Sequence, residues 1–163
     1  MSTNFDSELD SLLDKNDEKK KKHVEVQEKA RDEAAEFLSA FEEVATSIIR
    51  PALEHVKSQL EARGRLSRIE EESDGVTYDR KEKPAKISIY FNISPEDSIS
   101  SLDEYAHVCF YCDKRGKLVQ VHESTIGPNH GGHSGSSGSL QLSEVSEETV
   151  KEKVMKVLRE IFK

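Results

Sequence analysis

Apolar residues recur every three or four positions between residues 23 and 63, with glutamates and lysines filling the positions between them. This spacing keeps the apolar side chains on one face, so the sequence predicts a long helix over 23–63 with one buried stripe. Pro51 lacks an amide hydrogen and clashes with the turn before it, which predicts a kink or break near Ser47 to Arg50. Gly64 is a suitable C-terminal cap. The expected buried positions are Ala34, Phe37, Leu38, Phe41, Val44, Ala45, Ile48, Ala52, Val56 and Leu60.

Residues 65–143 change to a two-residue alternation that is typical of strands. The clearest case is AKISIYFNI, in which Ile87, Ile89 and Phe91 share one face and the polar residues share the other. Two further strand-like runs, AHVCFYC and KLVQVHE, flank the turn sequence DKRG. The Gly- and Ser-rich stretch at residues 127–139 predicts a flexible loop.

The C-terminal segment predicts a helix over residues 146–162. Ser146 is a good N-cap, and Glu147 and Glu148 in the first turn suit the positive end of the helix dipole. The order of helix, strands and helix indicates an α+β domain, residues 23–163, with a single antiparallel sheet of about five or six strands and both helices packed on it.

The central hairpin is expected to turn at Asp113 to Gly116, with Gly116 in the left-handed conformation. In that register Asp113 pairs with Lys117 and Cys109 with Val121, and both faces of the hairpin are apolar. Since a sheet with one wet face alternates apolar and polar residues, a second apolar face predicts a covering partner. The expected partner-binding residues of the hairpin are Val108, Phe110 and Leu118.

A metal site is the alternative interpretation of the same region. Cys109, Cys112, His130 and His133 are all possible zinc ligands, and a four-residue hairpin loop would instead place His107 opposite His122. Positions 109 and 112 differ by an odd number, so a regular strand points their sulfurs to opposite faces. We therefore expect buried structural thiols, with neither a metal, a redox pair nor a cysteine nucleophile.

Residues 1–22 predict an acidic tail that is disordered or folds on a partner. The run KNDEKKKK has nothing to bury, while the residues before it include one short apolar stripe at helical spacing. Such a short helix is marginal alone, and the stripe is a candidate for docking in a partner's groove. Its members are Phe5, Leu9, Leu12 and Leu13.

Composition narrows the function classes further. The 163 residues carry a net charge of −8, which disfavours binding to nucleic acid, and no apolar run approaches the roughly 20 residues needed to cross a membrane. Two cysteines and an N-terminus without a hydrophobic signal region suggest a reducing cytoplasm. The apolar share is only 34%, which suggests that part of the chain stays outside the core.

These features together favour a non-catalytic, cytoplasmic protein-interaction or regulatory module, homodimeric and without a cofactor. Its size, acidity and order of elements are similar to those of small bacterial secretion chaperones, with no shared motif, so an adaptor-like or chaperone-like role is expected. The alternative function is a zinc-binding or thiol-based protein that uses Cys109, Cys112, His130 and His133.

Overall fold

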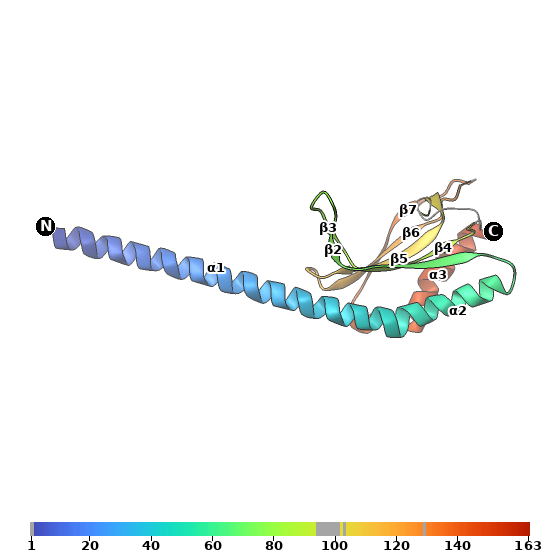
Figure 1. Cartoon of the computed structure of the whole chain (residues 1–163), viewed down its shortest axis with the longest axis horizontal. Helices are drawn as coiled ribbons and strands as arrows, with labels where there is room; N and C mark the ends of the chain where they lie inside the picture. The colour runs from blue at the N-terminus through green and yellow to red at the C-terminus, as the bar shows by residue number, and fades with distance from the viewer. Residues whose placement is uncertain (1, 94–101, 103, 129) are drawn as a thin grey trace. The chain divides into compact units, whose positions relative to one another are not determined.

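The computed structural model describes residues 2–93, 102, 104–128 and 130–163, with side chains from residue 4 onward (Figure 1). The chain divides into two compact units, Met1–Glu36 and Phe37–Lys163. Its elements in order are α1 (Ser2–Val44), the π-helical turn η1 (Ala45–Ile49), α2 (Arg50–Glu61), β1 (Ser67–Glu72), β2 (Gly75–Val76), β3 (Glu82–Lys83), β4 (Lys86–Phe91), β5 (His107–Asp113), β6 (Leu118–Ser124), β7 (Ser134–Leu140), the 3₁₀ turn η3 (Leu142–Glu144) and α3 (Glu147–Ile161).

The fold class is α+β, as the sequence predicts. Five antiparallel strands in the order β1-β4-β5-β6-β7 form the sheet, and β2 and β3 form a separate small hairpin. Helices α2 and α3 contact each other and pack on the same side of the sheet (Figure 1). The core lies between these helices and the facing side of the sheet, and includes Phe41, Leu53, Phe110, Val121 and Val154.

Helix α1 begins at Ser2, which is upstream of the start at residue 23 expected from the apolar stripe. The regular α-helix is interrupted near the position that Pro51 predicts, because the π turn η1 comes just before α2 and the proline lies in the first turn of α2. The wider π turn separates the proline ring from the carbonyl four residues earlier, with which the ring would otherwise clash. Gly64 ends the run at a φ of 73°, and the amide of Arg65 donates to the carbonyl of Leu60.

The π turn changes which residues face the core. One additional residue is equivalent to about 100° of rotation on an α-helix. As a result, Ile49 and Leu53 are fully buried, whereas Ile48 and Val56 are only partly buried at the edge of the core. The predicted stripe is therefore confirmed at Phe37, Phe41, Ala45 and Ala52, which are buried. Beyond the π turn, Ile49 and Leu53 replace Ile48 and Val56 at the centre of the core.

The central hairpin is one residue out of the predicted register. Asp113 pairs with Leu118, so Cys109 lies opposite His122 and not Val121. The turn is longer than expected, and Lys117, at a φ of 55°, takes the left-handed conformation that was assigned to Gly116. The amide of Gly116 donates to Oδ1 of Asp113, which holds the turn.

This shift also corrects the prediction that both hairpin faces are apolar. A slip of one residue moves every side chain of a strand to the other face. In the observed register Val119 and Val121 join Val108 and Phe110 on the core face, while Gln120 and His122 join Cys109 on the other face. The sheet thus alternates apolar and polar residues as a sheet with one covered face does.

The predicted flexible loop at 127–139 extends too far, because β7 occupies Ser134–Leu140. This Gly- and Ser-rich strand pairs with β6 at the edge of the sheet, with a register irregularity between Gln120 and His122. Lys153 of α3 donates to the carbonyl of Ser137, and Leu140 is buried. Tertiary pairing therefore overrides the weak strand propensity of the sequence.

Helix α3 matches its prediction closely. The side chain of Ser146 accepts a hydrogen bond from the amide of Thr149, and two glutamates occupy the first turn. The buried residues Val150, Val154, Val157 and Leu158 share one face of the helix. This helix covers β5 and β6 on the core side.

Candidate functional site

The N-terminal part of α1 presents apolar side chains to solvent. Every residue from Asn4 to Asp32 is exposed, and the exposed fractions of Phe5, Leu12 and Val26 are 66%, 64% and 66%. Several large apolar side chains exposed on one helix are typical of an interface, because most helices in proteins are stabilised by packing one apolar face.

Phe5, Leu9 and Leu12 are separated by four and then three residues, and the same alternation continued along α1 passes through polar residues before it reaches Val26 and Ala30. This is the heptad repeat of helices that pack side by side in a coiled coil, in which the repeating layers face the partner helix. We call this line of positions the α1 seam; it consists of Phe5, Leu9, Leu12, Asn16, Lys19, His23, Val26 and Ala30. Leu13 flanks it, so all four tail residues predicted to bind a partner lie on or beside the seam, and all four are exposed.

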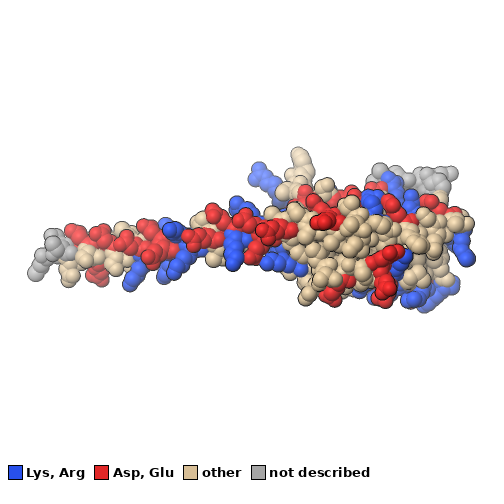
Figure 2. Space-filling model, turned by 90° about the horizontal axis from the view of Figure 1, so that it is seen from below, with Lys and Arg blue, Asp and Glu red and all other residues tan. Residues whose placement is uncertain are grey.

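The middle of the seam is basic. Lys19 and His23 lie on the seam itself, and Lys15, Lys20 and Lys22 flank it. The acidic residues of the same turns, Asp14, Asp17 and Glu18, fall on the opposite side of the helix by the helical period. Figure 2 shows acidic side chains over the N-terminal part of α1, and basic side chains interleaved with acidic ones further along.

The hairpin residues predicted to bind a partner are not a docking surface. Val108 and Phe110 are fully buried in the core beneath the helices of the same chain, so this part of the prediction is wrong. Leu118 is half-buried and lies on the opposite face of the hairpin from Val108 and Phe110. The error follows from the one-residue shift in register, which assigned Leu118 and Phe110 to the same face.

The two cysteines point to opposite faces of β5, as their odd spacing predicts. Cys112 lies in the core beside Val119, whereas Cys109 lies on the polar face opposite His122. Both are free thiols with buried side chains. Within residues 2–93, 102, 104–128 and 130–163, no three His, Cys, Asp or Glu side chains are placed to hold a metal ion.

Both thiols are held in the protonated form. Burial raises the pKa of Cys112 from 9.0 to about 12, and the negative charge of nearby Asp74 acts in the same direction. Burial also raises the pKa of Cys109, although a hydrogen bond with Ser88 and the charge of Lys86 partly oppose it. Because the thiolate is the reactive form of cysteine, burial disfavours the reactive form of both residues.

The polar face of the sheet brings two histidines together. The rings of His107 and His122 are stacked with centroids 5.7 Å apart, although the strand register pairs His122 with Cys109. Nδ1 of His107 is 2.8 Å from the carbonyl oxygen of Tyr105, and Nε2 of His122 is 3.2 Å from Oγ of Ser134. These contacts fix both rings in the sheet.

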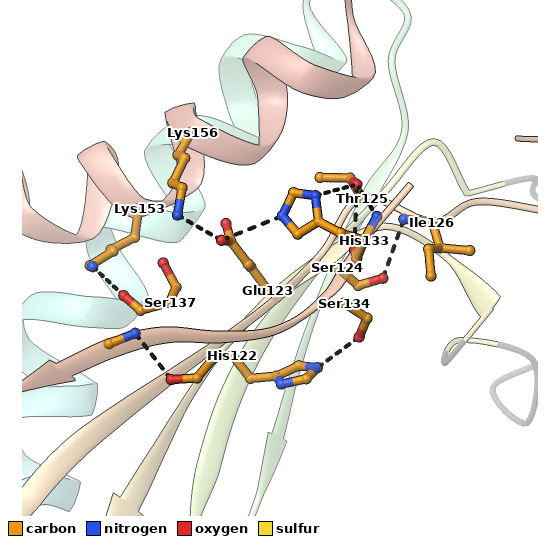
Figure 3. A network of polar contacts seen from close by, with 12 residues as sticks. His122, Glu123, Ser124, Thr125, Ile126, His133, Ser134, Ser137, Lys153 and Lys156 are labelled. Carbon is orange, nitrogen blue, oxygen red and sulfur yellow. Dashed lines mark hydrogen bonds and ion pairs between the residues drawn. The ribbon is translucent and has the colours of Figure 1, made fainter. Parts of the chain in front are cut away.

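A buried carboxylate, which the sequence analysis missed, connects the sheet to α3 (Figure 3). The side chain of Glu123 is only 4% exposed, and its Oε1 lies 2.7 Å from Nζ of Lys156 and 3.6 Å from Nε2 of His133. Its Oε2 is buried and has no hydrogen-bond partner among the described residues. Glu123 lies on the core face of β6, in line with Val119 and Val121. A charged residue at an otherwise apolar position of the alternating pattern could therefore have identified it from the sequence.

This cluster is an anchor for the chain before β7. Oγ1 of Thr125 accepts a hydrogen bond from the amide of His133 at 2.9 Å, and it also lies 3.3 Å from Nδ1 of that ring. The line from Thr125 through His133 to Glu123 has the order of a nucleophile, a base and an orienting acid. However, Thr125 is buried and already bonded to the backbone, so its hydroxyl is not presented to a substrate.

No family model, no curated protein and no solved structure matches this chain. In the part of the chain that the structure describes, every helix is too short or too polar to cross a membrane. The described geometry therefore leaves the α1 seam as the feature that most needs a functional explanation.

Proposed function

We propose that this chain is a non-catalytic protein-interaction module that assembles with a partner through the α1 seam. The partner helix packs along Phe5, Leu9 and Leu12, while the α+β unit Phe37–Lys163 is a folded domain attached to this helix. The single observation that supports the proposal is the exposed apolar stripe of Phe5, Leu9 and Leu12, which have the spacing of a heptad repeat near the start of α1.

The energetics are consistent with an interface. Burying a large apolar side chain stabilises by roughly 1.5–3 kcal/mol, so the four residues Phe5, Leu9, Leu12 and Leu13 together supply a substantial gross driving force. The loss of conformational entropy when two helices become ordered opposes association. Because α1 is already a helix in the structure, this entropy cost is smaller.

The partner helix belongs either to another protein or to a second copy of this chain, as in the homodimer expected from the sequence. An adaptor-like or chaperone-like role fits both cases, since each joins the folded domain to another chain. A cytoplasmic setting is part of the proposal; it is supported by the two free, buried thiols, which a reducing compartment maintains.

Photo-crosslinking in the native host tests the proposal at single positions. A photoreactive phenylalanine analogue replaces Leu9 or Leu12 on the seam, or Asp10 or Asp17 on the opposite side as matched controls. The proposal expects crosslinks to one defined protein, or to a second copy, from positions 9 and 12 and not from 10 and 17. Equal crosslinking from both sides, or none from the seam, would contradict it.

A further inference from the structure

From the charge along the seam we infer that the occupant is a helix of a different protein, with apolar residues opposite Phe5, Leu9 and Leu12 and acidic residues opposite the basic segment Lys15–His23. This inference rests on the proposed function and adds the chemical class of the partner. It follows from comparing the ways in which a helix can cover the seam.

In the described part of the chain, no ion pair neutralises the lysines that lie on or beside the seam. Across the described residues, Lys15, Lys19, Lys20 and Lys22 take part in no ion pair, and all are exposed. Lys19 occupies a seam position, where a coiled coil places the side chain against the partner. A partner must therefore either present negative charge there or bring like charges together.

A parallel second copy brings like charges together. In that arrangement each seam residue faces its own counterpart, so Lys19 faces Lys19 and His23 faces His23. The flanking position of Lys15 faces that of Lys20 in the other helix. Asn16 alone suits this pairing, since an asparagine at such a position is tolerated in parallel dimers at some cost in stability.

In an antiparallel pair of two copies, either apolar residues face each other or opposite charges do, but no single alignment achieves both. When Leu9 faces Leu12 of the other copy, Glu8 comes beside Lys15, but Lys19, Lys20 and Lys22 lie beyond the acidic residues Asp6, Glu8 and Asp10. When Asp6 and Glu8 are aligned with Lys20 and Lys22, Leu9 faces Lys19 and Leu12 faces Asn16. A different helix with an apolar half and an acidic half satisfies both requirements at once.

The test uses two synthetic helical peptides of equal length and the full chain. Both peptides carry leucines opposite Phe5, Leu9 and Leu12; one carries glutamates opposite residues 15–23 and the other carries lysines. Fluorescence anisotropy should show that the glutamate peptide binds about 100-fold more tightly at low salt, because several flanking pairs change from repulsion to attraction. The preference should shrink as salt is raised.

A charge-reversed chain provides the matched control. In the combined variant Lys15→Glu, Lys19→Glu, Lys20→Glu and Lys22→Glu, the preference should invert toward the lysine peptide, whereas Lys21→Glu on the opposite side should leave it unchanged. Circular dichroism confirms that each variant remains folded. Equal binding of the two peptides, or binding of neither, would overturn the acidic partner.

Sedimentation of the chain alone separates this inference from the proposed function. A monomer at micromolar concentration is the expected result. A dimer that dissociates when Leu9→Ser and Leu12→Ser are introduced would overturn the acidic partner and leave the interaction function of the seam intact. Loss of position-specific crosslinking at Leu9 and Leu12 would overturn the proposed function itself.

Discussion

Cys109 of β5 lies directly opposite His122 of β6, and this pairing determines which side of the sheet is covered. It places Val121 under the helices and Gln120 on the polar face. That other face carries histidine, serine and glutamine side chains together with Tyr90, which packs in a second, smaller cluster with Leu102 and Tyr105, so the chain itself covers part of this face.

The strand register predicts that substitutions at two neighbouring positions of β6, Val121 and Gln120, reduce the unfolding free energy by different amounts. Val121→Ala removes two methyl groups from a fully buried site and should cost about 2 kcal/mol of unfolding free energy. Gln120→Ala, on the other face, should change it by less than about 1 kcal/mol. Urea unfolding of both variants measures the difference, and equal losses would indicate that the register is not the one described.

The π turn predicts a similar difference in unfolding free energy between substitutions at Ile49 and Ile48. Ile49→Ala should cost about 2–5 kcal/mol, because Ile49 is fully buried. Ile48→Ala should cost clearly less, since Ile48 lies only at the edge of the core. A regular helix would reverse the order of the two losses, so thermal or urea unfolding of the pair tests the presence of the additional residue in this turn.

The ion pair between Glu123 and Lys156 should couple the sheet to α3. Lys156→Met removes the ammonium group that pairs with the buried Glu123 carboxylate, and should cost about 1–3 kcal/mol. Lys151→Met breaks the exposed pair with Glu147 and should cost no more than about 0.5 kcal/mol.

A double-mutant cycle separates the energy of the Glu123–Lys156 ion pair from the energy lost with the aliphatic part of the lysine side chain. Combining Lys156→Met with Glu123→Gln should recover most of the loss, because the amide removes the unpaired buried charge. If the two substitutions were simply additive in urea unfolding, Glu123 and Lys156 would not interact.

The Cys112 thiol predicts a loss of stability at alkaline pH. Its pKa is raised by burial from 9.0 to about 12, so above pH 9 the unfolded chain releases this proton while the folded chain keeps it. The folded state then binds more protons, and the unfolding free energy falls with pH by at most about 1.4 kcal/mol per unit between pH 9 and 12. Below pH 9 this contribution is constant.

Urea midpoints at pH 8, 9 and 10 under reducing conditions measure this effect as a difference between chains. Cys112→Ala should show a flatter decline than the unmodified chain, whereas Val119→Ala, across the same strand pair, should keep the original slope. Identical slopes for Cys112→Ala and the unmodified chain would mean that the thiol is not buried.

Some features of this fold are determined by local chemistry and could be predicted from the sequence. Gly64, Ser146 and Pro51 each act through one property, namely a left-handed φ, a hydroxyl acceptor and a missing amide hydrogen, and each marks the expected boundary. The alternation around Ile87 and Ile89 likewise identified a buried strand, because two-residue periodicity has few other causes.

Other features depend on long-range packing that no local pattern reveals. The hairpin register is set by a turn with Lys117 in the left-handed conformation, which a sequence containing Gly116 does not suggest. Strand β7 has almost no strand propensity and is held by its pairing with β6 and by Lys153. At the candidate site, the apolar tail residues were identified, but the basic segment Lys15–His23 was interpreted only as charged tail.

Removal of residues 1–22 should leave the melting temperature of the rest of the chain nearly unchanged. The described side chains from Asn4 to Lys22 are all exposed, so their loss uncovers no core. Differential scanning calorimetry should show a shift within about 2 °C, which is smaller than the shift caused by 1 kcal/mol in a domain of this size. A large drop would show that the tail packs on the folded domain.

Amide hydrogen exchange along α1 is the most direct test of the claim that this helix is an interface. It should be measured on the chain alone and on the complex recovered from the native host. The account predicts that amides of residues 5–30 exchange much faster in the free chain than those of α2 and α3, and become protected in the complex. Strong protection of α1 in the free monomer, unchanged in the complex, would contradict it.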